Sequence, residues 1–583
     1  MSPEELERLY IEATAFYRNG DLQQAGRLFE RILQQASNIA PAHNGLGLCL
    51  YGAGNQAAAL QSFETAIRFD PFFASAHINR GMVLRDMGRH DAALASLEKA
   101  VALDPHNPNA HSNRGMVLTE LQQPAAANAC FDRCLQLAPD FPDVAGIRLL
   151  NKVHVCDWVN LEPEIAALLD AVKRGVQATP PWPLLALTDD AALKRQVMER
   201  WMRTKCPEVP ALGPLKTYTG HQRIKLGYFS ADYHRHATAH LIAELFERHD
   251  RAKFEVIAFS FGDDTGDDMQ QRIAAGCTRY LDVRARSDRD IAALARTLEI
   301  DIAIDLKGFT LQNRIGIFAH RAAPVQVNYL GFPGTMGTPY MDYIIADGVV
   351  IPESHKRFYT EKVVNLPGSY QCNDRKRAVS KRAYTRAEAG LPETGIVFCC
   401  FNNNFKILPG IFARWARIMN AVPGSVLWLI EDNPQAAANL KRNAPAFGLD
   451  PARIVFAPRI PPDEHLARHK LADLFLDTLP YNAHTTASDS LWVGVPLVTC
   501  PGESFPARVA ASLLTAVGLP ELAAPTLEEY ETLAIALAQD PTRLQALKDH
   551  LIATRATAPL FDTDAFTRNI EAAYTGMHEA RAH

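Results

Sequence analysis

The sequence has few cysteines, and they lack the spacing of metal-binding motifs, which argues against a cysteine-ligated metal site. Its 10 cysteines are scattered along 583 residues, and none forms a Cys-x-x-Cys pair. Cys130 and Cys134 are one helical turn apart, but no second ligand pair follows them, so we interpret them as small helix-packing residues. We therefore expect no metal site. A reducing compartment, the cytoplasm, is the natural location for such a protein.

Strong charge and long apolar runs are also lacking. The formal net charge is −5, so no global field attracts nucleic acid or an anionic membrane. No apolar run is long enough to span a bilayer, and the acidic N-terminus lacks the basic-then-apolar pattern of a signal peptide. We expect a cytoplasmic protein without nucleic-acid or membrane partners, whose oligomeric state the sequence does not indicate.

Two common nucleotide-binding motifs are missing as well. No Gly-x-Gly-x-x-Gly opens either of the α/β regions described below, and no Walker loop with Gly-Lys-Ser or Gly-Lys-Thr is present. Their absence argues against a dinucleotide-dependent oxidoreductase and against a P-loop nucleotidase.

The first part of the sequence contains a repeat of 34 residues. Each copy has small residues where two helices touch, a large apolar residue that locks them, and a proline that ends the second helix, which is typical of tetratricopeptide repeats. The repeated positions are Gly47, Gly81 and Gly115; Ala59, Ala93 and Ala127; Phe63, Leu97 and Phe131; and Pro71, Pro105 and Pro139. A weaker copy at Ala13, Ala25 and Phe29 brings the number of repeats to four, and we assign residues 1–140 to an all-α solenoid.

Stacked repeats of this kind leave a concave groove that binds peptides or other proteins. Asn44, Asn79 and Asn113 recur near the face of the first helix of each pair. They either donate hydrogen bonds to a peptide backbone in the groove or are solvated polar positions, and the sequence does not decide between these. Residues 141–220 are helical in pattern, and we interpret them as a connector.

From residue 223 onward, strands and helices alternate, which predicts two parallel sheets with helices on both faces. In a first lobe, residues 221–385, we expect strands at 224–229, 254–259, 300–304, 325–330, 343–345 and 363–366. In a second lobe, residues 386–583 including closing C-terminal helices, we expect strands at 396–400, 426–430, 453–456, 474–476 and 496–498. Two doubly wound lobes imply a cleft between them, with ligands at the carboxyl ends of the strands.

Two segments of the second lobe contain candidate residues for phosphate chemistry. Thr485 and Thr486 stand at the start of a predicted helix, where free backbone N–H groups favour a phosphate, and His484 adds a donor. Asp489, about one turn further on, is placed to accept from a ribose hydroxyl. Lys406 follows the strand 396–400 and is placed to neutralise a diphosphate leaving group. The alternatives are ordinary helix capping and a solvated loop lysine.

Two segments of the first lobe are further candidates. His236 and His240 are four residues apart, but the Glu of a His-Glu-x-x-His zinc motif is absent, so we interpret His236 as an active-site imidazole. A histidine that merely caps a helix is the alternative. Gly331 and Gly334, beside Thr335, permit a ligand to approach the backbone closely, although a tight turn explains them nearly as well.

Taken together, these segments resemble the protein O-GlcNAc transferase family. Residues 402–406, 482–489 and 501–503 are similar to its second catalytic lobe, and residues 236–240 and 333–337 are similar to its first. The short array is similar to that of the bacterial members. The resemblance implies a GT-B architecture of two Rossmann-like lobes and a UDP-GlcNAc donor. It also implies inverting transfer to Ser or Thr hydroxyls of proteins, with no cofactor and no metal.

The resemblance also implies roles for individual residues. Lys406 matches the lysine that stabilises the departing diphosphate, and His236 matches the active-site histidine, which is a candidate to relay the acceptor proton. The residues that match donor contacts are His465 at the uracil ring, Arg468 beside the base, Asp489 at the ribose, His484, Thr485 and Thr486 at the phosphates, and Asn403, Gly331, Gly334 and Thr335.

Three departures from the family pattern leave the identity of the nucleotide-sugar donor undecided. Asn403 stands where the animal enzymes have glutamine, Pro462 where they have a ribose-contacting lysine, and Met336 where they have serine. The plant SPINDLY relatives share the architecture and resemble protein O-fucosyltransferases that use GDP-fucose. A tetratricopeptide scaffold with decayed catalytic lobes is a further alternative. The retention of Lys406 and His236 argues against decay.

Overall fold

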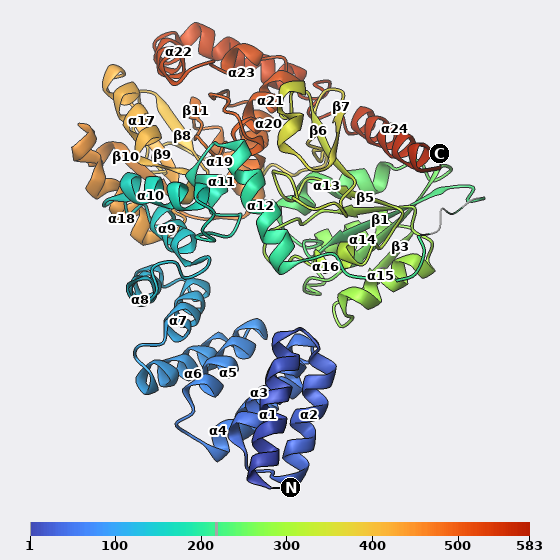
Figure 1. Ribbon diagram of the computed structural model, residues 1–583. Helices are drawn as coiled ribbons and strands as arrows, with labels where there is room; N and C mark the ends of the chain where they lie inside the picture. The colour runs from blue at the N-terminus through green and yellow to red at the C-terminus, as the bar shows by residue number, and fades with distance from the viewer. Residues whose placement is uncertain (1, 211, 216–217, 219, 583) are drawn as a thin grey trace. The chain divides into compact units, whose positions relative to one another are not determined.

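The computed structural model describes residues 2–210, 212–215, 218 and 220–582 (Figure 1). Its contacts divide the chain into two compact units, Met1–Lys152 with Ala166–Thr179, and Val153–Ile165 with Pro180–His583. The segment 141–220, interpreted above as a connector, is thus shared between the two units. No helix among the described residues is long and apolar enough to cross a membrane.

The first unit is an array of paired helices. The pairs are α1 (Pro3–Arg18) with α2 (Leu22–Gln35), α3 (Ala40–Gly52) with α4 (Gln56–Phe69), α5 (Ala74–Asp86) with α6 (His90–Leu103), and α7 (Pro108–Glu120) with α8 (Pro124–Leu137). The repeated glycines allow the close pairing, since a Cβ on Gly81 would lie 2.6 Å from the Leu97 side chain, and one on Gly115 would lie 2.5 Å from the Phe131 ring. The predicted solenoid of four helix pairs is confirmed.

Four helices follow the array along the chain: α9 (Val144–His154), α10 (Leu161–Lys173), α11 (Leu184–Leu187) and α12 (Ala191–Lys205). The last of them belongs to the second unit and places Met198 and Met202 in a core of the first lobe.

The first lobe contains a sheet of seven parallel strands in the order β3-β2-β1-β4-β5-β6-β7. The strands are β1 (Ile224–Ser230), β2 (Phe254–Ser260), β3 (Arg279–Asp282), β4 (Ile302–Asp305), β5 (Val325–Asn328), β6 (Tyr343–Asp347) and β7 (Lys362–Leu366). The helices are α13 (Ala237–Arg248), α14 (Asp268–Gly276), α15 (Asp288–Thr297) and α16 (Gly316–Ala319). The chain order reverses between β1 and β4, which makes a topological switch point there.

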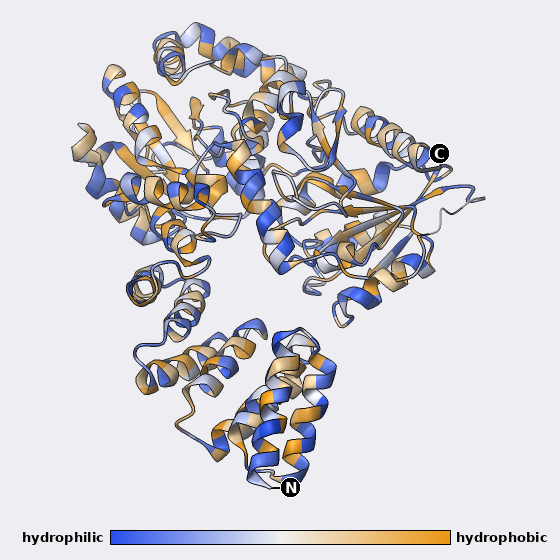
Figure 2. Cartoon of the chain, viewed as in Figure 1, coloured by the Kyte–Doolittle hydropathy of each residue, from blue (hydrophilic) through white to orange (hydrophobic). Residues whose placement is uncertain are grey.

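The second lobe repeats this plan with five parallel strands in the order β10-β9-β8-β11-β12. The strands are β8 (Val397–Cys400), β9 (Val426–Ile430), β10 (Ile454–Ala457), β11 (Leu474–Leu476) and β12 (Leu497–Val498). The helices are α17 (Pro409–Ala421), α18 (Pro434–Asn443), α19 (Pro462–His469), α20 (Thr485–Trp492), α21 (Val509–Ala516), α22 (Leu527–Gln539) and α23 (Pro541–Thr554). Its switch point lies between β8 and β11, and apolar residues dominate the strands of both sheets (Figure 2). The predicted two-lobed α/β fold is confirmed.

Several features of the lobes were not predicted. Strand β3 and helix α14 are absent from the sequence prediction, because β3 is a short edge strand with exposed charged ends and α14 is short. The last helix, α24 (Thr563–Ala582), returns to the first lobe, where Ile570 and Tyr574 join its core (Figure 1). The first lobe is therefore built from two segments that are far apart in the sequence.

Candidate functional site

The switch point of the second lobe brings Lys406 next to the segment that opens α20. Lys406 ends a 3₁₀ turn, Asn404–Lys406, that follows β8, and residues 477–484 follow the neighbouring strand β11. The Lys406 Nζ donates a hydrogen bond to the Asn482 carbonyl at 2.8 Å. The sequence predicted both segments as ligand sites, and the strand order makes them one site.

The ammonium group of Lys406 is largely withdrawn from water. The residue is 9% exposed, and its Nζ lies 3.8 Å from the centre of the Tyr481 ring. Burial lowers the pKa of Lys406 to about 8, although the nearby Asp477 carboxylate opposes this shift. A poorly solvated cation interacts strongly with an anion placed beside it, which suits Lys406 for contact with a phosphate.

At the N-terminus of α20, no side chain of the described residues caps the backbone N–H groups. Thr485 is the first residue of this helix, and His484 at the capping position accepts no hydrogen bond from it. The Thr486 hydroxyl donates to the Asn402 side chain and so does not cap the helix. Unpaired N–H groups and the helix dipole together favour an anion at this point.

The His484 side chain does not offer the hydrogen-bond donor to a phosphate that the sequence suggested. Its Nε2 lies 3.2 Å from the Pro506 carbonyl, and burial lowers its pKa well below the usual value, with the charge of Lys406 acting in the same direction. The neutral ring therefore uses its single N–H on Pro506 and has none left for a phosphate.

His465 and Arg468, both on α19, form a neighbouring pair. The Arg468 guanidinium donates to His465 Nδ1 at 3.1 and 3.2 Å and to the Pro458 carbonyl at 2.6 Å. Burial and, after it, the positive charge of Arg468 lower the pKa of His465 to about 3. The imidazole is thus neutral and held edge-on to the Phe401 ring, with ring centres 4.8 Å apart. A fixed neutral ring is suited to stacking on a base.

Asp489 lies in the first turns of α20 and has a partner that the sequence did not reveal. Its carboxylate forms an ion pair with Arg377, and both side chains are largely buried. Burial raises the pKa of Asp489, while the charge and hydrogen bond of Arg377 oppose this change. No sequence pattern linked these two residues, because they lie 112 positions apart.

His236 follows β1 and occupies the capping position of α13, which agrees with the alternative interpretation of a helix-capping histidine. Its Nδ1 accepts a hydrogen bond from the Thr238 backbone N–H at 3.2 Å and lies 3.4 Å from the Asp232 carboxylate. Burial lowers the pKa of His236, and Asp232 opposes this. Its side chain remains 43% exposed, so it can reach a ligand.

Asp232 and Lys307 form a buried ion pair behind His236. The Lys307 Nζ donates to both Asp232 oxygens at 2.7 and 2.8 Å, and both residues are nearly inaccessible. They follow β1 and β4, the strands that flank the switch point of the first lobe. Neither residue was predicted as a site residue from the sequence, although each is a charged residue two positions after the end of a buried strand.

The glycine loop after β5 is held by protein contacts. A Cβ on Gly331 would lie 2.0 Å from the Leu306 carbonyl oxygen, so this glycine is required by the packing of the backbone. The Gly334 carbonyl accepts from Asn328, and the buried Thr335 hydroxyl donates to Glu361 at 2.6 Å. Asn403, in contrast, is exposed beside Lys406. Contact of Gly331, Gly334, Thr335 and Asn403 with a donor stays a prediction.

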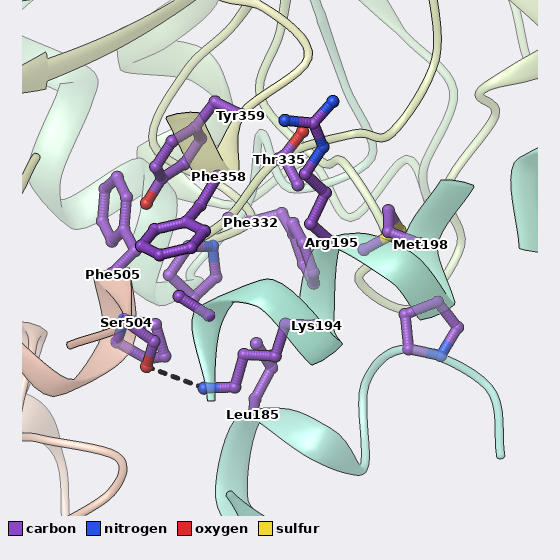
Figure 3. A pocket seen from close by; sticks show the side chains of 15 residues that line it. Leu185, Lys194, Arg195, Met198, Phe332, Thr335, Phe358, Tyr359, Ser504 and Phe505 are labelled. Carbon is purple, nitrogen blue, oxygen red and sulfur yellow. Dashed lines mark hydrogen bonds between the residues drawn. The ribbon is translucent and has the colours of Figure 1, made fainter. Parts of the chain in front are cut away.

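A small cavity lies beside the glycine loop (Figure 3). Phe332, Phe358 and Phe505 line it, and at its edge the Lys194 Nζ donates to the Ser504 hydroxyl at 2.8 Å. Its free space is about 30 Å³. This is room for about one water molecule, so the cavity is too small for a nucleotide sugar. Of the residues predicted to bind the donor, Gly334 and Thr335 line this cavity, whereas Lys406 and Asp489 do not.

Comparison with known families identifies both parts of the chain. The model of glycosyl transferase family 41 matches residues 214–385 and 380–570. Tetratricopeptide repeat models match residues 10–72, 81–122 and 108–141.

Curated proteins and a solved structure show the same similarity. A probable UDP-N-acetylglucosamine–peptide N-acetylglucosaminyltransferase, SEC, of Arabidopsis thaliana is 39% identical over 374 residues, which cover 63% of this chain and 38% of that protein. A protein of Petunia hybrida called SPINDLY, with the same probable activity in its name, is 34% identical over 61% of this chain and 39% of its own length. The chain thus spans about two fifths of these relatives. The structure of a mutant Thermobaculum terrenum O-GlcNAc transferase aligns with a TM-score of 0.69 and 27% identity, covering 94% of this chain and 98% of that one.

Proposed function

The chain belongs to glycosyl transferase family 41, and from this premise we propose that it is an inverting protein O-GlcNAc transferase. In the proposed reaction, a Ser or Thr hydroxyl of a protein acceptor attacks the anomeric carbon of UDP-GlcNAc. The bond from that carbon to the diphosphate oxygen breaks, the configuration at the carbon inverts, and the hydroxyl proton leaves. UDP and the glycosylated protein are the products.

The observation that carries this proposal is the buried ammonium of Lys406, bonded at 2.8 Å to the segment that opens α20. Negative charge grows on the diphosphate as the glycosidic bond breaks. Lys406 and the free N–H groups of α20 are preorganised to meet this charge, which lowers the energy of the transition state more than that of the bound donor. They supply the charge stabilisation for which other transferases use Mg²⁺, and independence of metal is part of the proposal.

His236 is the residue that we assign to the acceptor side of the reaction. In the neutral imidazole, the hydrogen bond from the Thr238 N–H to Nδ1 leaves the proton on Nε2. His236 is therefore set to donate a hydrogen bond to the acceptor or the donor. To accept the hydroxyl proton it must first change tautomer, and Asp232, held by Lys307, stabilises the Nδ1–H form that this requires.

The acceptors are proposed to be proteins that bind in part to the tetratricopeptide array. In that array the Asn79 side chain donates to Asn44 at 2.8 Å, and Asn113 donates to the Asn109 carbonyl at 2.9 Å. These amides keep further donors and acceptors for a peptide backbone. The cytoplasm is the proposed location, which fits the free state of the cysteines.

A thermal-shift panel with UDP-GlcNAc, UDP-glucose and GDP-fucose tests the donor. A ligand that binds only the folded protein raises its melting temperature by mass action, so UDP-GlcNAc should give the largest shift. A larger shift with GDP-fucose would replace the proposal by a fucosyltransferase. No shift with any of the three would indicate a scaffold whose lobes no longer bind donors.

A further inference from the structure

The segment that joins the two lobes carries three consecutive basic residues, and the third differs from the others. We call residues 371–380, which lie between β7 and β8, the interlobe strap. Arg375 donates to the Glu244 carboxylate through its backbone N–H at 2.8 Å and its guanidinium at 3.1 Å. Lys376 forms an ion pair with Glu247 at 2.5 Å. Both acceptors lie on α13 of the first lobe, so these two residues fasten the strap there.

Arg377 instead reaches the second lobe, where its Nη1 forms an ion pair with Asp489 Oδ1. Gln371, at the start of the strap, donates to the hydroxyl of the preceding residue of α20, Ser488. Two contacts on adjacent residues therefore fix the strap against the first turns of α20. Arg377 and Asp489 are 14% and 11% exposed in their side chains, so the ion pair is poorly solvated.

The ion pair leaves hydrogen-bonding groups unused on both partners. Within the described ranges, Asp489 Oδ2 has no hydrogen-bond donor, and the Nε and Nη2 groups of Arg377 have no acceptor. None of these atoms is sealed from solvent. A largely buried guanidinium with unused donors, beside a carboxylate with an unused oxygen, is complementary to a group that offers both hydroxyl donors and oxygen acceptors. Adjacent hydroxyls of a ribose fit this description.

Electrostatics place Arg377 at the nucleoside end of the site. After burial and the adjacent Arg468, the charge of Arg377 is the next cause that lowers the pKa of His465. At the other end, burial and the charge of Lys406 lower the pKa of His484. Arg377 is thus bonded to Asp489, the expected ribose ligand, and its charge acts on His465, the expected base contact. Lys406, in contrast, contacts the segment expected to hold the diphosphate.

We propose that Arg377 is a ribose-recognition residue. It holds Asp489 by Oδ1 so that Oδ2 is turned to a ribose hydroxyl, and its own free N–H groups donate to the ribose oxygens. The inference rests on the proposed function, since it takes α20 and α19 as the nucleotide site. It adds a contact from the strap, which is fastened to the first lobe, and so makes ribose recognition at the second lobe depend on the junction of the two lobes.

The test compares ribose with deoxyribose nucleotides on the full chain. Isothermal titration calorimetry would measure UDP, 2′-deoxy-UDP and 3′-deoxy-UDP binding to wild type, Arg377→Ala and Lys376→Ala. We expect wild type to prefer UDP over at least one deoxy analogue by about tenfold or more, as charge-assisted hydrogen bonds warrant. Arg377→Ala should weaken UDP binding by about tenfold to 100-fold and bring the ratio of UDP to deoxy-UDP affinity near one. Lys376→Ala removes the same charge from the adjacent position and should keep the ratio.

The ratio of UDP to deoxy-UDP affinity distinguishes the loss of a specific ribose contact from a general loss of nucleotide binding. If Arg377→Ala weakens UDP and both deoxy analogues equally, or changes none of them, the inference is wrong. Arg377→Gln, which keeps a donor and similar length, gives the same comparison should the alanine variant unfold. If wild type binds GDP in preference to UDP, the proposed donor fails, but GDP and 2′-deoxy-GDP then test Arg377 in the same way. Binding of neither nucleotide to wild type overturns both proposals.

Discussion

Lys406 sits between two adjacent strand ends, and its ammonium group contacts the segment expected to hold the diphosphate. The charge that it is proposed to meet grows as the bond breaks, so its contribution is larger in the transition state than in the bound donor. We expect Lys406→Ala to lower turnover by about 10²–10³ while UDP still binds. Single-turnover transfer at saturating donor, with calorimetry of UDP beside it, measures the two effects.

Lys406→Arg provides the matched control for charge. The planar guanidinium does not place its charge where the ammonium lies, so this variant should also be poor. Near-normal transfer by Lys406→Ala would remove Lys406 from the mechanism.

The pKa of Lys406 also predicts a pH dependence. Burial lowers this pKa to about 8 in the unliganded protein, so the side chain is cationic below pH 8 and neutral above it. The cation is the form that stabilises the diphosphate. The value of kcat/KM for the donor should therefore fall as the pH rises through about 8, and above that pH it should fall by about tenfold per pH unit. The residual activity of Lys406→Ala should lack this alkaline limb. A flat wild-type profile to about pH 9.5, with thermal unfolding unchanged over that range, would contradict the prediction.

At the scale of elements, the repeat pattern specifies how closely the helices of a pair approach. Gly81 in α5 faces Leu97 of α6, and an added Cβ would lie 2.6 Å from that side chain. We expect Gly81→Ala to destabilise the array by about 1–3 kcal/mol, because the pair must separate or Leu97 must leave its rotamer. Urea unfolding followed by circular dichroism measures the change.

Gly26, in the middle of α2, is the matched control. A Cβ there would meet Cys49 at 3.8 Å, an ordinary contact. Gly26→Ala should be neutral or stabilising by up to about 1 kcal/mol, since alanine favours a helix over glycine. Equal unfolding midpoints for the Gly81 and Gly26 variants would mean that helix contact does not explain the repeated glycines.

At the scale of the whole molecule, the residues of the candidate donor site all belong to the second unit. We expect deletion of residues 1–140 to leave UDP affinity within about threefold, while transfer to protein acceptors falls because the groove supplies remote binding energy. Calorimetry and a transfer assay on a protein substrate measure these two quantities. A short peptide acceptor, unable to reach the array, should be modified equally by both proteins. Undiminished transfer to proteins would show that the groove does not bind acceptors.

The sequence by itself determined the features that depend on local patterns. The spacing of Gly81, Leu97 and their equivalents specified the helix pairs, since each contact joins two neighbouring helices. Alternation of buried strands and helices specified two α/β lobes. It also placed Lys406 and Thr485 at the ends of strands, because polar residues that follow a buried strand must lie at the edge of its sheet. The family resemblance, stated from these motifs, is confirmed.

Only the tertiary structure decided which distant groups meet. Strand order brings Lys307 to Asp232, and the path of the strap brings Arg377 to Asp489, across 75 and 112 positions of sequence. Gly331 is a further example, since the backbone of Leu306, which directly follows strand β4, leaves no room for a side chain there. The physical reason is that helix and strand periods encode which face of an element is buried, whereas its partners depend on how whole elements dock. Burial then shifts the pKa of Lys406 and His465, and no local pattern records burial by remote segments.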